Sequence, residues 1–201
     1  MSINSIPEKP AKVGKPSRLS EILERYEDVF GDDLGCCKGP SVSILVQQDA
    51  APRFRAAWKV PYAWNQKLEG ELEQLQEEGI IEPVRHSDWA SPIVPILKSD
   101  GSLRICRDYK RTVNSVCKVD VYPLPRVEDL FAKLERGKKF TKIDLRQAYA
   151  QLPLDEGSRQ LTTINTQHGL FQYRRLPFGI ASTPAIFQRR IEGILLGVTS
   201  T

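Results

Sequence analysis

Asp144 is the residue whose type and place in the sequence could do chemistry. It follows residues 140–143, where apolar and polar side chains alternate as in a half-buried strand, so the chain is expected to leave a sheet here. Tyr149 places an aromatic ring shortly afterwards. A carboxylate at a strand end suits Mg²⁺, which binds one or two carboxylates together with substrate phosphates and water. Alternatively, Asp144 caps the short helical turn of residues 145–149.

A second group of candidate residues belongs to an expected β-hairpin. Residues 91–97 and 103–109 flank Ser99-Asp100-Gly101, and the Asp-Gly pair is a strong turn signal. Lys98 stands beside this turn, where a long cationic side chain could reach a polyphosphate. The same cations could equally form a solvated strand face. They are Lys98, Arg104, Arg107 and Lys110.

The remaining elements are expected from hydrophobic periodicity and from capping and turn residues. Leucines recur at helical spacing over residues 65–78, and Gly79 follows as a stop signal. The other expected elements are an amphipathic helix capped by Ser20, a short strand over residues 42–46, and a helix from Val127 that ends at Gly137. A second hairpin of residues 161–166 and 170–175 and a helix capped by Thr183 are also expected.

Five sequence blocks point to one family. They are residues 89–94, 98–110 and 122–126, the stretch around Asp144, and residues 176–188. In this order they resemble the fingers and palm of reverse transcriptases from the gypsy class of long-terminal-repeat retrotransposons. The resemblance implies an α+β fold with the fingers and a partial palm of a right-hand polymerase, truncated. Residues 1–60 are expected to form a flexible arm with a short helix, and residues 61–201 the reverse transcriptase domain.

The family's activity is RNA-directed DNA synthesis, a template-directed nucleotidyl transfer that uses two Mg²⁺ ions. By resemblance, Asp144 is the first of three catalytic carboxylates, and the backbone carbonyl of Leu145 is a further metal ligand. The resemblance also implies partners: an RNA or DNA template-primer, deoxynucleotides, and the remainder of a pol polyprotein, in which the polymerase is usually fused to ribonuclease H.

The resemblance assigns nucleotide-binding residues as well. Lys98 and Arg104 match cations that bind the triphosphate, and Tyr149 matches a gate that excludes a 2′-hydroxyl by shape. The remaining matches are Phe178 and Gly179 beneath the nucleotide, and Asp108 and Lys110 on the template side.

The sequence departs from the family at its end. The other two catalytic aspartates belong to a Tyr-x-Asp-Asp hairpin, and Thr201 comes before any such motif. At most one Mg²⁺ ion is then expected to be held, loosely, and the chain alone is expected to be inactive. A second hypothesis is a non-catalytic retroelement remnant that binds nucleic acid or a partner protein.

Composition restricts these hypotheses only weakly. The net charge is +4 and the pI near 8.9, which permits a nucleic-acid partner without requiring one. No apolar run approaches the roughly 20 residues needed to cross a bilayer, so no membrane partner is expected. The 4 cysteines and 2 histidines show no zinc spacing, and the cysteines are expected to be reduced thiols. An intracellular protein is therefore expected, with cytoplasm or nucleus left open.

Overall fold

The computed structural model describes residues 18–31, 33–119, 122–123, 126–135, 137–138 and 142–196. The chain divides into two compact units, Met1–Asp33 and Leu34–Thr201. The boundary expected near residue 60 stays a prediction, although residues 34–60 belong to the second unit by their contacts. For example, the Val42 amide donates to the Pro153 carbonyl at 2.8 Å.

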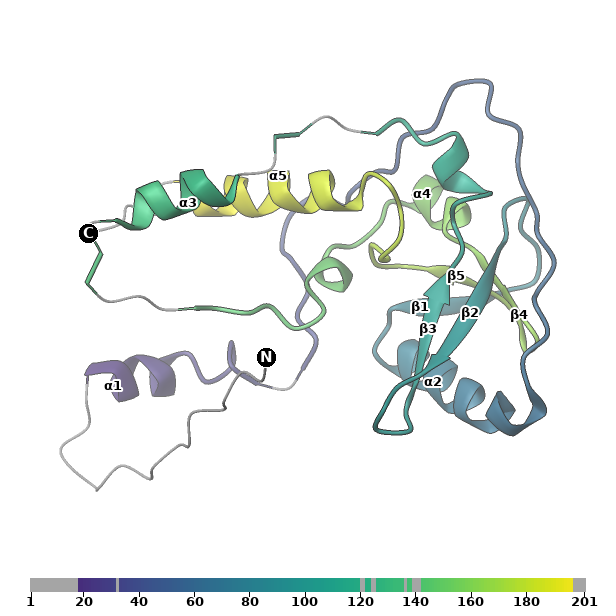
Figure 1. The fold of residues 1–201 in the computed structure, drawn as a ribbon, viewed down its shortest axis with the longest axis horizontal. Helices are drawn as coiled ribbons and strands as arrows, with labels where there is room; N and C mark the ends of the chain where they lie inside the picture. Colours follow the sequence, from purple (N-terminus) through teal and green to yellow (C-terminus); the bar gives the residue numbers. More distant parts are fainter. Residues whose placement is uncertain are drawn as a thin grey trace. The chain divides into compact units, whose positions relative to one another are not determined.

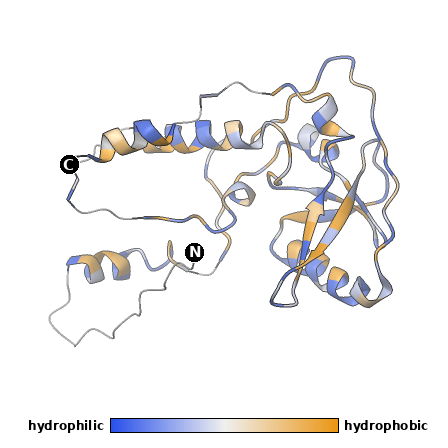
Figure 2. Cartoon of the chain, in the orientation of Figure 1, coloured by the Kyte–Doolittle hydropathy of each residue, from blue (hydrophilic) through white to orange (hydrophobic). Residues whose placement is uncertain are grey.

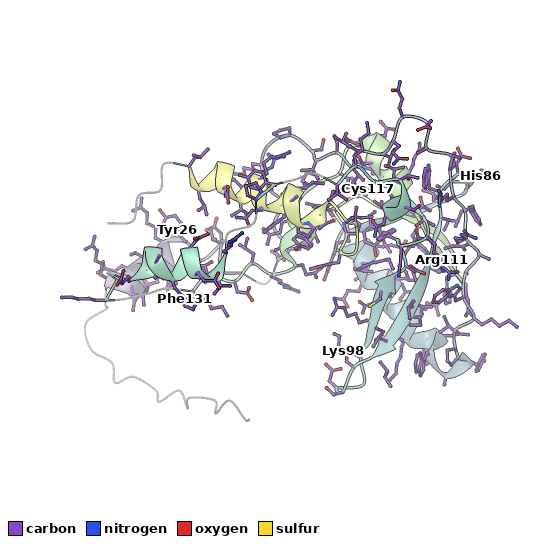
Figure 3. The ribbon with its side chains drawn as sticks, turned by 45° about the horizontal axis from the view of Figure 1, so that its top comes forward. Tyr26, His86, Lys98, Arg111, Cys117 and Phe131 are labelled. Carbon is purple, nitrogen blue, oxygen red and sulfur yellow. The ribbon has the colours of Figure 1, made fainter. Side chains whose placement is uncertain are left out.

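The first unit contains helix α1 (Arg18–Arg25). The helix starts before Ser20, so the expectation that Ser20 caps it is wrong. Its apolar side chains are exposed, including that of Tyr26 in the turn that follows (Figure 3). Residues 26–30 form turns rather than a continuation of the helix.

The second unit is built on a five-stranded sheet in the order β1-β5-β4-β2-β3 (Figure 1). Its strands are β1 (Ile81–Val84), β2 (Ser91–Leu97), β3 (Leu103–Arg107), β4 (Ile164–Thr166) and β5 (Gly169–Tyr173). Strands β2 and β4 pair in parallel, and the other neighbours are antiparallel. Both expected hairpins, β2–β3 and β4–β5, are confirmed.

Four helices and three 3-10 turns complete the described part of this unit. They are η1 (Tyr62–Trp64), α2 (Asn65–Glu77), η2 (Val113–Ser115), α3 (Val127–Leu134), η3 (Ala148–Gln151), α4 (Glu156–Leu161) and α5 (Thr183–Leu195). The expected helices α2, α3 and α5 are confirmed, but α3 ends at Leu134 rather than at Gly137, and Ser182 rather than Thr183 is the N-cap of α5. Helix α4 is not among the expectations, and it includes Leu161, where the expected strand begins. Asp155 caps this helix by accepting the Ser158 amide at 2.7 Å.

The core forms where α2 packs against β1 and β3 (Figure 1). Leu68, Leu72 and Leu75 are 0%, 2% and 8% exposed, as their helical spacing predicts. In Figure 2, β2 and β3 are mainly apolar, whereas α2 alternates between apolar and polar residues. The sheet and α2 therefore bury one apolar surface between them.

Two further expectations differ from the structure. Residues 42–46 form no strand and make only isolated bridges, Val42 with Leu154 and Val46 with Cys117. Strand β1 is not among the expectations; it contains Pro83, which is tolerated because β1 is an edge strand.

The strand expected before Asp144 is only partly described. Phe140 and Thr141 lie outside the described residues. Lys142 and Ile143 form no strand, and the Ile143 side chain is 73% exposed. The strand expectation is therefore wrong for these two residues, because the alternating pattern here does not follow burial.

Candidate functional site

A cavity of about 370 Å³ lies where α2, the β2–β3 hairpin, and the chain around η3 meet. It brings together three residues that the resemblance assigns to nucleotide binding, namely Lys98, Arg104 and Phe178. Its other charged or amide side chains are Glu71, Gln74, Glu78, Arg107 and Gln147.

Three cations reach the cavity from the hairpin. Lys98 lies at the tip of the hairpin, directly after β2 (Figure 3). Arg104 and Arg107 belong to β3, where Arg104 is exposed and Arg107 is half-buried. The turn holds this arrangement locally, because the Lys98 amide donates to the Ser102 carbonyl at 2.8 Å and Asp100 Oδ1 accepts the Ser102 amide at 2.8 Å.

Two carboxylates face these cations from α2 and its C-cap. Burial raises the pKa of Glu71 above its ordinary value, Lys98 and Arg107 oppose this shift, and Glu78 adds to it. Sequence reasoning missed both glutamates, because it placed them on the solvated face of an amphipathic helix. The signal that could have found them is helical spacing, since Glu71, Leu75 and Glu78 lie on one face and Leu75 is buried.

The turn that leads into η3 forms one wall of the cavity. Gln147 has φ 44° and ψ 47°, and its Nε2 donates to Glu78 Oε2 at 3.1 Å. Tyr149 follows, with its ring centroid 4.5 Å from that of Phe178 and 5.1 Å from that of Phe187. The Tyr149 ring thus packs on a cavity-lining residue, although Tyr149 itself does not line the cavity.

Asp144 lies outside the cavity lining. It is exposed, and so is Leu145, which is 42% exposed. The structure therefore brings the predicted nucleotide cations together with Phe178 but does not bring the predicted catalytic carboxylate into the same cavity.

The other predicted residues also lie outside the cavity lining. Gly179 has φ 95°, and a Cβ there would lie 3.4 Å from Cδ2 of Tyr109, so backbone and ring approach closely. Its carbonyl accepts a hydrogen bond from Asn114 Nδ2 at 2.7 Å. Asp108 Oδ1 accepts the Lys110 amide at 3.2 Å in the loop after β3.

The described residues contain no group of three histidine, cysteine, aspartate or glutamate side chains arranged to hold a metal ion. Asp144 thus supplies one carboxylate, which is fewer than a two-metal site requires. In the same part of the chain, no helix has the length and apolarity needed to span a bilayer.

The cavity lining thus combines three cations, two glutamates and the ring of Phe178. A sequence profile of the family described as reverse transcriptase (RNA-dependent DNA polymerase) matches residues 96–200. The chain therefore belongs to the reverse transcriptase family.

Relatives support this membership. The chain is 39% identical over 186 residues to the uncharacterized protein K02A2.6 of Caenorhabditis elegans, and 30% identical over 193 residues to the retrovirus-related Pol polyprotein from transposon 412 of Drosophila melanogaster. These alignments cover 91% and 90% of this chain but 15% of each relative. The chain thus corresponds to a reverse transcriptase segment of pol polyproteins.

Solved structures show the same fold. Prototype foamy virus protease-reverse transcriptase superposes with a TM-score of 0.79 at 22% identity, covering 91% of this chain and 25% of that chain. The foamy viral enzyme in complex with an RNA/DNA hybrid gives 0.73 at 20% identity, covering 90% and 24%. The expected α+β, reverse transcriptase-like fold is confirmed.

Proposed function

We propose that this chain is the fingers and partial palm of a gypsy-class retrotransposon polymerase, and that its cavity binds the triphosphate of an incoming deoxynucleotide. The observation that carries the proposal is the convergence of Lys98, Arg104 and Phe178 on one cavity. Phe178 lies far along the sequence from Lys98 and Arg104, which belong to one hairpin.

The charge balance of the cavity supports a polyphosphate ligand. Lys98, Arg104 and Arg107 are opposed by Glu71 and Glu78, and the raised pKa of Glu71 makes its negative charge easier to neutralise. Two of the cations are exposed side chains on a hairpin, so they can reorient toward phosphate oxygens. A triphosphate in this place would receive charge-assisted hydrogen bonds as pyrophosphate leaves.

We assign the sugar and base to the side of the cavity that Phe178 lines and against which Tyr149 packs. An aromatic ring against the sugar excludes a 2′-hydroxyl by shape and so selects deoxynucleotides. Phe178 is 45% exposed and offers an apolar face for stacking, while Gly179 permits close backbone approach.

Reverse transcriptases generally depend on divalent metal ions. We assign Asp144 and the Leu145 carbonyl as ligands for Mg²⁺, because an exposed carboxylate can bind this hard cation together with nucleotide phosphates. We assign Asp108 and Lys110 to the template side and an RNA or DNA template-primer as the nucleic-acid partner.

The free cysteines indicate the cellular compartment in which the protein acts. Cys36, Cys37, Cys106 and Cys117 form no disulfide. Unpaired thiols are typical of reducing compartments, so we propose an intracellular site of action.

Equilibrium binding of dATP with Mg²⁺, followed by calorimetry, tests the proposed site. We expect Lys98→Gln and Arg104→Gln each to weaken binding about tenfold or more, since each removes a charge-assisted hydrogen bond. Arg85→Gln is the matched control, because Arg85 is exposed and lies outside the cavity lining. Equal affinities for the wild type and both cavity variants would contradict the proposal.

A further inference from the structure

Gln147 has an unusual backbone conformation at the edge of the cavity. Among the described residues it is the non-glycine residue with positive φ, at φ 44° and ψ 47°. The left-handed region costs free energy for a residue with a Cβ, so it persists only where the surroundings hold it.

The side-chain contact that holds Gln147 in this conformation comes from Glu78, at the end of α2. Gln147 Nε2 donates to Glu78 Oε2 at 3.1 Å, and Gln74 Nε2 donates to Glu78 Oε1 at 3.0 Å. Both carboxylate oxygens are thus engaged. Glu78 is the C-cap of α2, and its amide donates to the Gln74 carbonyl at 2.9 Å. Because three buried leucines anchor α2, Glu78 fixes Gln147 from a rigid helix.

Packing does little to hold the stretch before Gln147. Ile143 is 73% exposed and Leu145 is 42% exposed. Two hydrogen bonds within the turn stabilise it. The Ala150 amide donates to the Gln147 carbonyl at 2.7 Å, and Gln151 Nε2 donates to the Arg146 carbonyl at 2.8 Å. The described side-chain contact that joins Gln147 to α2 is the one with Glu78.

We propose that Glu78 is a positioning residue for nucleotide selection. By holding Gln147 left-handed, it sets where the ring of Tyr149 lies against Phe178, and thereby how strongly deoxyribonucleotides are preferred over ribonucleotides. Discrimination by shape depends on the place of the excluding ring, so a small displacement of the turn weakens it. The selectivity part of this inference rests on the proposed nucleotide site.

Exchanging donor and acceptor in the Gln147–Glu78 hydrogen bond distinguishes a positioning role of Glu78 from a general effect on folding. Gln147→Glu places two carboxylates against each other and breaks the contact. The double variant Glu78→Gln with Gln147→Glu restores one N–H···O hydrogen bond between the same positions. The matched control is Gln172→Glu, which breaks a Gln–Glu pair between β5 and β1, where Gln172 Nε2 donates to Glu82 Oε1 at 2.6 Å.

Two measurements on the 201-residue chain show the effect of these variants. Amide hydrogen exchange at Ala150 reports the turn without any ligand. Calorimetric titration with dATP and with ATP, each with Mg²⁺, reports selectivity as a ratio of dissociation constants. In Gln147→Glu we expect Ala150 to exchange about tenfold faster or more, as when a hydrogen bond to a charged group is lost, and the selectivity ratio to fall severalfold.

The double variant should return both values to within about threefold of the wild type, and Gln172→Glu should leave both unchanged. Unchanged Ala150 exchange in Gln147→Glu, or no rescue in the double variant, would overturn the inference. Altered exchange with an unaltered selectivity ratio would show that Glu78 is merely structural. If the wild type binds neither nucleotide, the proposed site and the selectivity it implies are both contradicted, while the exchange data still decide whether Glu78 holds the turn.

Discussion

Arg107 Nε donates a hydrogen bond to the Tyr173 hydroxyl at 2.5 Å, and the guanidinium carbon lies 4.7 Å from the ring centroid. Arg107 ends β3 and Tyr173 ends β5, and two other strands separate these in the sheet order. Burial raises the pKa of Tyr173, so its hydroxyl stays protonated at neutral pH. The pair therefore ties two non-adjacent strands together beside the cavity.

Tyr173→Phe should destabilise the protein by about 1–3 kcal/mol, because the half-buried Arg107 would lose its acceptor. Urea unfolding followed by circular dichroism measures the change. Tyr62→Phe is the control, since Tyr62 is 91% exposed. Equal losses in both variants would show that the contact adds no stability.

Asp155→Ala should lower the free energy of unfolding by about 0.5–2 kcal/mol. Asp155 Oδ1 caps α4 by accepting the Ser158 amide at 2.7 Å, and Oδ2 accepts from the Ser43 hydroxyl. Asp155→Asn keeps a capping oxygen and should lose less. Thermal or urea unfolding that ranks Asn below Ala in stability would count against the cap.

Asp155 should also make the free energy of unfolding depend on pH. Burial acts to raise the pKa of Asp155, but hydrogen bonds from Ser43 and Ser158 outweigh it, so the pKa lies below its ordinary value. The unfolded chain then binds the proton more readily, and the contribution to stability is fully present above the unfolded pKa of about 4. It is lost as the pH falls through the lower folded pKa. Unfolding free energies should therefore fall less steeply below pH 5 in Asp155→Asn than in the wild type.

Two glycine substitutions should have opposite signs. Gly179→Ala forces a Cβ into φ 95° and toward the ring of Tyr109, so it should destabilise the protein by about 1 kcal/mol or more. Gly70→Ala in α2 meets nothing within 4 Å and should stabilise by about 0.5–1 kcal/mol. Melting temperatures that move in the same direction for both variants would refute this reasoning.

Tyr149→Val should leave dATP binding nearly intact and strengthen ATP binding. Valine removes the ring that packs 4.5 Å from Phe178, so space opens where a 2′-hydroxyl would lie. Phe187→Leu tests the alternative that any loosening of this aromatic cluster admits ribonucleotides. Calorimetry with dATP and with ATP measures both affinities. An unchanged affinity for ATP in Tyr149→Val would show that Tyr149 does not exclude ribonucleotides.

Single-stranded nucleic acid should bind weakly, with an affinity that falls steeply as salt is added. Neutralised phosphates release counterions, so each cation that contacts one adds about 0.7 to the slope of log affinity against log salt. Fluorescence anisotropy of a labelled oligonucleotide measures this slope. Replacing Lys98 and Lys110 by glutamine should lower it by about 1–2. A flat salt titration would show that the basic hairpin is only solvated surface.

Local chemistry explains which parts of the fold could be predicted. The β2–β3 hairpin follows from Asp100 and Gly101, since Asp100 accepts the Ser102 amide and Gly101 adopts φ 81°. Helix α2 follows from its leucine spacing. Helix α4 was missed because its short sequence has no clear apolar period and its cap, Asp155, is held partly by a distant residue, Ser43.

The candidate site was predictable only in part. Lys98, Arg104 and Phe178 were found through motif resemblance, whereas Glu71 and Glu78 were not. Helical spacing places both on the face of the buried Leu75, but it does not show that β3 is the element packed against this face.

The parallel pairing of β2 with β4 has a consequence for how the chain folds during synthesis. Ser91 pairs with Ile164, and β1 pairs with β5 through Ile81 and Tyr173, so both partners lie far along the chain. Until a ribosome has released residues 164–173, the β2–β3 hairpin is the part of the sheet that can form, and an isolated hairpin is marginal in water. Pairings of such long sequence separation slow folding and leave strands exposed meanwhile. Nascent chains that stop before Tyr173 should therefore depend on chaperones to avoid aggregation.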